Sequence, residues 1–209
     1  QLNTPLKLLK KGSRKIFSFC SIANMKKLLF LTCIILLLTS CYIQQATSIL
    51  TSTDYDSKED KTDYLYLPYG KVSLPGKWLK KEYDSNSKQQ YFTNQDSVII
   101  AIAFGPCNKF EFNADGNKKG FEFLEAFYNW DSKYFIEEHK LLVEKIEEDT
   151  TTNFILWHVE SEDRKLDTYF LFGISPNCSF SNFSIQATKK WSREKKIEFL
   201  KNLYLNESN

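Results

Sequence analysis

Apolar and polar positions alternate with a period of two along most of the chain beyond residue 70, a pattern typical of β-strands with one buried face. Clusters of Asp, Asn, Ser and Thr separate these segments and predict turns. The strands that we expect cover residues 70–74, 77–83, 89–93, 98–104, 141–147, 154–161, 166–174 and 179–187. Residues 98–104 are apolar at every position, which predicts a central strand that is covered on both faces.

Helical spacing replaces the alternation in two places. Aromatic residues and a leucine recur at this spacing between residues 121 and 135 and predict a helix over residues 120–140, for which an interruption near residues 131–132 stays open. Ser192 is placed to cap a final helix. One apolar face of that helix consists of Ile197, Leu200, Leu203 and Tyr204. The pattern predicts an α+β fold with one antiparallel sheet of about six or seven strands, a middle helix and a C-terminal helix packed on it.

The N-terminal part follows a different pattern, with two lysines, a short apolar run over residues 28–38 and small residues that lead to Cys41. The run is too short to span a bilayer comfortably, so residues 25–40 fit a secretory signal segment. The sequence Leu-Thr-Ser-Cys that ends at Cys41 resembles the bacterial lipobox. This resemblance implies cleavage between Ser40 and Cys41 and acylation of the cysteine, for example with palmitate. The alternative is an uncleaved helix or a buried core segment.

The regions around this signal complete the expected organisation. Residues 1–24 are basic, contain no acid and precede the only methionine, so we expect an over-extended N-terminus, with an organelle transit peptide as the alternative. Residues 41–63 are expected to form a lipidated tether, residues 64–205 a single α+β domain and residues 206–209 a tail. In bacterial lipoproteins an Asp after the acylated cysteine commonly marks inner-membrane retention. Tyr42 at this position favours a cell-envelope location at the outer membrane, facing the periplasm.

Charge changes once the signal is set aside. Seven of the 28 basic residues lie before Cys41, where there is no acid, so the rest of the chain carries 21 basic and 26 acidic side chains, a net charge of −5. Proteins that bind nucleic acid need a basic surface that displaces counterions from phosphates. The expected mature chain therefore has no nucleic-acid partner.

A family resemblance rests on residues 69–78, with the sequence Tyr-Gly-Lys-Val-Ser-Leu-Pro-Gly-Lys-Trp. This segment, followed by hairpin strands, a helix, a meander and a closing helix, resembles the PsbP-like fold. That superfamily includes photosystem II extrinsic subunits and many bacterial lipoproteins. The resemblance implies a domain that binds or stabilises protein partners, shares no catalytic motif and gives no functional residue to carry across.

Two cysteines, Cys107 and Cys178, lie beyond the acylated residue in the expected mature chain. Both are expected at strand ends, where loops can meet. Two thiols in a small domain outside the cytoplasm predict a disulfide, and the alternative is two unpaired cysteines in loops.

The polar segment 111–122 resembles an EF-hand calcium loop in part. Its oxygen donors fall at the first, third, fifth and twelfth positions, namely Glu111, Asn113, Asp115 and Glu122, and Gly116 is at the sixth. Glu stands where the loop uses Asp, Lys118 stands where it needs an apolar residue, and no helix is expected before it. A polar turn that leads into a helix is the favoured interpretation, so we expect no metal and no cofactor.

His158 and Glu160 are two residues apart in an expected strand and so lie on the same face, which makes His158 the candidate for a general base. The simpler interpretation is a strand histidine that is packed in the fold. The chain contains no nucleophile elbow, Walker loop, zinc spacing or dinucleotide fingerprint, so we expect no enzyme activity.

The first functional hypothesis is a non-catalytic, membrane-anchored envelope lipoprotein that binds or stabilises a protein partner. Its expected anchors are the exposed aromatic residues Tyr64, Tyr66, Tyr69 and Trp78. The alternative is a lipoprotein that binds a small ligand or lipid in an aromatic-lined pocket.

Overall fold

The computed structural model describes residues 48–163 and 165–207. The chain forms a compact unit from Ile49 onward. The expected signal segment, the cleavage site at Ser40 and the acylation site at Cys41 lie outside the described residues. No helix in the described part of the chain is long and apolar enough to cross a membrane.

The larger of two antiparallel sheets has seven strands in the order β4-β5-β6-β10-β9-β8-β7. Its strands are β4 (Leu79–Asp84), β5 (Gln89–Thr93), β6 (Ile99–Pro106), β7 (Leu142–Asp149), β8 (Phe154–Glu160), β9 (Asp167–Ile174) and β10 (Ser179–Ile185). Strands β7 to β10 form the expected meander, because each pairs with the next along the chain. β6 is an interior strand and is buried from Ile100 to Gly105, as its apolar sequence predicts, although β10 is the middle strand.

A second sheet contains β1 (Leu50–Asp56), β2 (Lys61–Leu67) and β3 (Gly70–Pro75) in sequential order. This sheet corrects the expected tether, because residues 50–63 belong to the domain as β1 and the first part of β2. β1 is mostly exposed, so its sequence shows no buried alternation. Its backbone is instead satisfied by a ladder to β2 that runs from Leu50 opposite Leu67 to Asp56 opposite Lys61. The carboxylate of Asp56 accepts the backbone N–H of Lys58 in the turn, at 2.8 Å.

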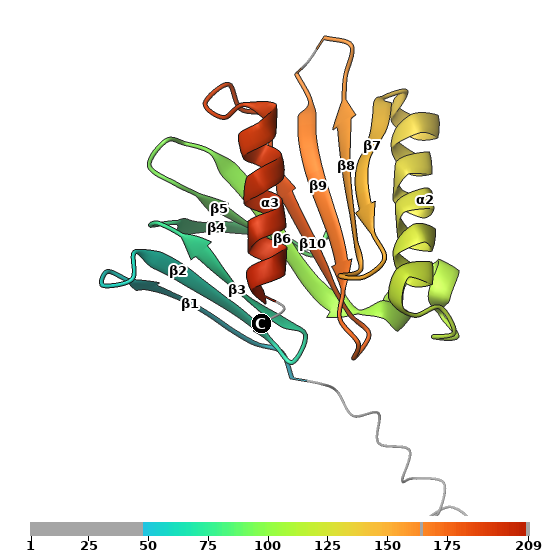
Figure 1. Cartoon of the computed structure of the whole chain (residues 1–209), viewed down its shortest axis with the longest axis horizontal. Coiled ribbons are helices and arrows are strands. Elements are labelled where there is room, and N and C mark those ends of the chain that lie inside the picture. The colour runs from blue at the N-terminus through green and yellow to red at the C-terminus, as the bar shows by residue number, and fades with distance from the viewer. Residues whose placement is uncertain (1–47, 164, 208–209) are drawn as a thin grey trace, which may run out of the picture. The chain divides into compact units, whose positions relative to one another are not determined.

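Two α-helices within residues 48–163 and 165–207 pack on the sheets, and the α+β class with a middle and a C-terminal helix is confirmed (Figure 1). α2 (Gly120–His139) is continuous, so the interruption considered near residues 131–132 does not occur. It ends at Lys140, whose left-handed backbone lets its N–H bond Ile136 O. α3 (Arg193–Glu207) begins with the expected cap, because Ser192 Oγ accepts the N–H of Lys195 at 3.3 Å.

The two faces of the large sheet are covered differently. α3, together with β2 and β3, covers one face over a core that includes Tyr64, Leu74, Leu156, Leu171 and Leu200. On the other face α2 packs mainly on β7, β8 and β9, through Phe123, Leu124 and Phe127, and it reaches β10 where Phe127 contacts Phe180 at 5.4 Å. We call the first the closed face and the second the open face. Figure 1 shows α3 lying across the sheet and α2 beside β7.

Candidate functional site

The part of the open face that α2 leaves uncovered forms a groove of about 1010 Å³. Its floor comes from β5, β6, β9 and β10, and one wall is α2. Aromatic side chains dominate the lining, among them Tyr66, Tyr69, Tyr91, Phe110, Trp130, Tyr134, Phe170 and Phe180. Trp130 and Tyr134 are 41% and 51% exposed, so large apolar surface remains open to solvent here.

Small residues on β6 and aromatic contacts on α2 give the groove its shape. Ala103 and Gly105 form part of the floor. A Cβ atom at Gly105 would lie 2.9 Å from Cε1 of Phe180, so glycine is needed for Phe180 to pack there. On the wall, Phe127 stacks on Phe172 with ring centroids 4.3 Å apart. The indole N–H of Trp130 donates to Glu111 Oε1 at 2.7 Å, which holds the rim of the groove.

Cys107 and Cys178 form a disulfide, with Cα atoms 5.3 Å apart. The backbone N–H of Cys107 also donates to Cys178 O at 2.9 Å. The link ties the 3₁₀ turn η1 (Cys107–Lys109), which follows β6, to the turn before β10. Because Pro106, Lys109 and Phe110 line the groove, the disulfide fixes one of its ends.

Asp131 and Asn182 are polar side chains of the groove that make no hydrogen bond or ion pair with another described residue. Asp131, on α2, is partly buried, and burial raises the pKa of its carboxyl to about 7. Asn182, on β10, is only 9% exposed, and its Oδ1 is buried without a hydrogen bond. Buried polar groups normally have hydrogen-bond partners, so these two unpartnered side chains mark the groove as unusual.

The four oxygen donors of the calcium-loop candidate are all engaged within the protein. Asn113 is fully buried, and its amide bonds the backbone of Cys107 and Lys118. Asp115 accepts from Asn117, Glu122 pairs with Lys118 at 3.1 Å, and Glu111 accepts from Trp130. No cluster of three potential metal ligands occurs in the described part of the chain. The segment is a loop built around Asn113 that leads into α2.

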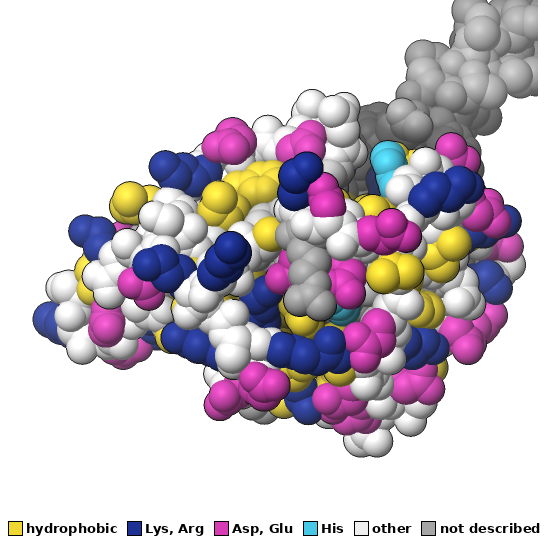
Figure 2. Space-filling view, turned by 90° about the horizontal axis from the view of Figure 1, so that it is seen from above, with side chains coloured by type: hydrophobic (Ala, Val, Ile, Leu, Met, Phe, Trp, Pro, Cys, Tyr) yellow, Lys and Arg dark blue, Asp and Glu magenta, His cyan; other side chains and the backbone are white. Residues whose placement is uncertain are grey.

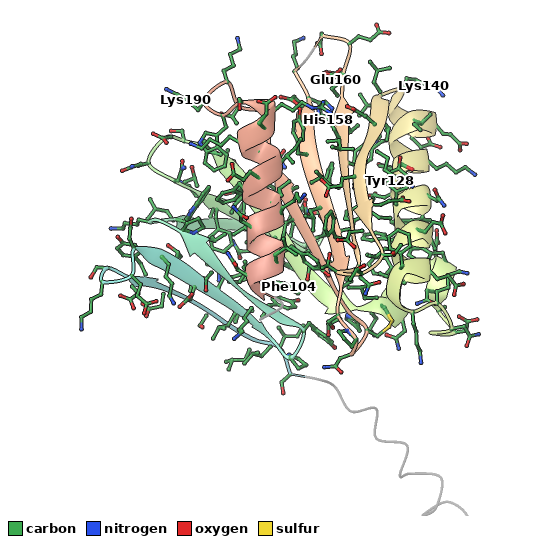
Figure 3. All side chains as sticks on the ribbon, in the orientation of Figure 1. Phe104, Tyr128, Lys140, His158, Glu160 and Lys190 are labelled. Carbon is green, nitrogen blue, oxygen red and sulfur yellow. A yellow bond between two sulfur atoms is a disulfide. The ribbon has the colours of Figure 1, made fainter. Side chains whose placement is uncertain are left out.

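His158 lies on the closed face, in a cluster of charged groups near the upper ends of β8 and β9 (Figure 3). Its Nε2 is 2.7 Å from Asp167 Oδ1, and its ring stacks on Tyr169 at 4.2 Å. The carboxylate of Asp167 also accepts from Lys196 Nζ of α3 at 2.7 Å, and the Lys196 side chain is 4% exposed. Despite partial burial, which raises it, the pKa of Asp167 is lowered on balance by Lys196 and His158.

This charge cluster is a structural one. His158 is 5% exposed, and the lining of the groove includes neither His158 nor Asp167 nor Lys196. Glu160, the neighbour considered from the sequence, pairs with Asp167 in register across β8 and β9. A carboxylate that is shared between a histidine and a lysine ties α3 to the sheet.

The aromatic anchors expected for a protein partner divide into two groups. Tyr64 and Trp78 are 2% and 4% exposed and belong to the core of the closed face, so the expectation that they are exposed is wrong. Tyr66 and Tyr69 are partly buried and line the groove. The molecular surface in Figure 2 intersperses basic and acidic side chains, with no broad basic patch on the side shown.

Sequence reasoning missed Asp131 and Asn182 as site residues. The signal for Asp131 was present, because it is four residues from both Phe127 and Phe135 and so falls on the aromatic face of the helix. A scan against protein-family models finds no family that matches the chain, and a search of curated proteins finds no similar sequence. The fold and groove thus define this chain as a small α+β domain with one large aromatic-lined groove, and function must be argued from that groove.

Proposed function

We propose that the domain is a non-catalytic binding protein that takes an amphipathic small molecule, such as a lipid, into the groove of the open face. The observation that carries the proposal is the groove itself, of about 1010 Å³ and lined mainly by aromatic side chains. Ligand pockets typically enclose about 300–1,000 Å³ and combine apolar walls with a few polar groups. The groove lies at the upper end of that range, which suits a molecule with a long apolar body.

The location in the cell is part of the same proposal. A lipid anchor at Cys41 would hold the domain at a membrane of the cell envelope, where lipids are at hand. The disulfide supports an oxidising compartment outside the cytoplasm. The protein-partner hypothesis stays a prediction, but two of its four aromatic anchors are in the core, which favours the small-ligand alternative.

Titration with N-phenyl-1-naphthylamine, an apolar dye that brightens when it leaves water, tests the proposal. We expect the purified full-length chain to bind this dye and to quench Trp130, the only tryptophan among the residues that line the groove. Ala103→Phe fills the floor and should weaken binding at least about tenfold, whereas Ala187→Phe, at an exposed position outside the groove lining, should not.

A graded variant guards against misfolding, because Ala103 is only 4% exposed. Ala103→Val should give an intermediate loss of dye binding while urea unfolding shows an intact domain. Equal binding by the wild type and both Ala103 variants would refute the groove as the binding site.

A further inference from the structure

We propose that the groove selects an amphiphile with a cationic ammonium head, which pairs with the Asp131 carboxylate beside Asn182 while the apolar body lies on the aromatic side chains. The inference rests on the proposed function and names the class of ligand. It follows from the position of the two polar residues, from their lack of protein partners and from the rings around them.

The packing of α2 places Asp131 over the strand pair β9 and β10. Phe127 stacks on Phe172 at 4.3 Å, and Phe135 packs against Phe170 at 5.9 Å. Asp131 is one helical turn from each, so it lies over the stretch of β9 between those two rings. In register, Asn182 on β10 is directly opposite Phe172. The carboxylate and the amide therefore belong to the same part of the groove.

Both groups offer acceptors that the described protein leaves unused. No hydrogen bond or ion pair joins Asp131 to another described residue, and Asn182 Oδ1 is buried without a partner. An ammonium carries three donors and a positive charge, so one such head can satisfy a carboxylate and an amide oxygen together. A carboxylate or phosphate head is disfavoured, because its oxygens are acceptors and would lie against the acceptor oxygens of Asp131 and Asn182.

The aromatic rings around Asp131 favour a cation as well. Trp130 and Tyr134 are on the same helix, one residue before and three residues after Asp131, and both line the groove. Faces of Trp and Tyr attract ammonium groups, and this attraction strengthens when water is excluded. The combination of aromatic faces with one acidic group is the usual chemistry of an ammonium site.

Charge in the groove supports the assignment. Burial alone raises the pKa of Asp131 to about 7, with no opposing contribution from a nearby cation. The other charged side chains of the lining are Asp84, Lys88 and Lys109. The backbone N–H of Asn86 lowers the pKa of Asp84, which therefore stays ionised between pH 6 and 8. An ammonium ligand would supply the positive charge that Asp131 lacks.

Three probes with the same ten-carbon chain, namely decylammonium, decanol and decanoate, test the inference below their micelle concentrations. Calorimetric titration of the full-length chain should give the order decylammonium, decanol, decanoate, with about tenfold between the first two at pH 8. Decylammonium stays protonated throughout. Its affinity should fall about tenfold from pH 8 to pH 6, because Asp131 takes up a proton below its pKa of about 7 and the carboxylate is lost.

Matched variants assign the effect to Asp131. Asp131→Asn should lower decylammonium affinity to that of decanol and remove the pH dependence, whereas Glu125→Gln, an exposed acid of α2 outside the groove lining, should change neither. Asn182→Leu should lower the affinity for decylammonium about three- to tenfold. The ring of His139 contacts that of Tyr134 at 4.8 Å, so His139→Asn is the control variant and must leave the pH dependence in place.

The outcomes separate this inference from the proposed function. Equal affinity for all three probes, lost in Ala103→Phe, would overturn the ammonium assignment and leave the groove as a general amphiphile site. A preference for decanoate, or a decylammonium affinity unchanged in Asp131→Asn, would overturn it too. Failure of every probe to bind would overturn the proposed function, and the inference with it.

Discussion

The two faces of the seven-stranded sheet treat buried charge in opposite ways. On the closed face, the side chain of Lys196 is 4% exposed and its ammonium bonds Asp167, which also bonds His158. On the open face, Asp131 is partly buried and has no ion pair with any described residue. The same chain therefore pairs its buried ionisable groups where two elements join and leaves one unpaired where a groove lies open. This difference separates a residue that holds the fold from one that is free to meet a ligand.

Packing of apolar side chains shows the same contrast. Leu156, Leu171 and Leu200 on the closed face are 0% exposed. Trp130 and Tyr134 at the groove are 41% and 51% exposed, although they lie on a helix whose other aromatic residues are buried or partly buried. Stability should therefore depend mainly on the closed face, and binding mainly on the open one.

The largest effect should come from the covalent link that closes one end of the groove. Cys107 and Cys178 enclose 71 residues, and removing a cross-link over a loop of that length releases chain entropy worth about 4 kcal/mol. The double substitution Cys107→Ser, Cys178→Ser should lower the free energy of unfolding by about that amount in urea denaturation. A reductant should have a similar effect on the wild type and none on the double variant. A loss below about 1 kcal/mol would mean that packing alone closes the open face.

A pair of truncations compares the faces directly. Leu156→Ala removes a fully buried side chain from the closed face and should cost about 3 kcal/mol, through lost burial and the cavity left behind. Tyr134→Ala, at the groove, should cost less than about 1 kcal/mol, because half of that side chain is already in solvent. Urea unfolding of the two variants measures both values. Equal costs would show that the groove rim carries structural packing and would weaken its assignment as a binding surface.

The sequence predicted most of the large sheet because its strands bury alternate side chains. Residues 89–93 were placed with the bounds that β5 has, and the four strands of the meander were all anticipated. β1 was not, because an exposed edge strand needs only a backbone partner, and its Thr, Ser and Asp residues fit a tether equally well. The sequence also predicted Tyr64 and Trp78 at the surface. It did not predict the small sheet that buries Tyr64.

The site was harder to predict than the fold. The cysteine pair followed from counting thiols, but the groove depends on how much of the sheet α2 covers, and helix placement is a long-range property. Asp131 suggested a break in the helix, although one acid on an aromatic face also fits a helix that borders a cavity. Asn182 gave no signal, because a strand asparagine is polar in either environment. Asn182 is identified as a site residue only by the structure, in which its buried Oδ1 has no hydrogen bond.

A smaller loss of stability than that of Leu156→Ala should come from the charge cluster of the closed face. Lys196→Met removes the ammonium that joins α3 to Asp167 and should cost about 2 kcal/mol, less than for a fully buried pair because Asp167 is 27% exposed. Lys189→Met, at an exposed position before α3, should cost almost nothing. The double variant Lys196→Met, Asp167→Asn should recover part of the loss, because it leaves no carboxylate without its cation.

The pH dependence of unfolding tests whether the positive charge of Lys196 stabilises the ionised Asp167. The pKa of Asp167 is lowered in the folded protein, so the folded state favours the ionised carboxylate. The stability that it contributes is fully present above the ordinary pKa of an aspartate and is lost as the pH falls through the lowered value. Melting temperatures measured from pH 7 down to pH 2 should therefore fall more steeply for the wild type than for Lys196→Met. Parallel curves would mean that Lys196 acts only by packing, and the contrast between paired and unpaired buried charge would then rest on His158 alone.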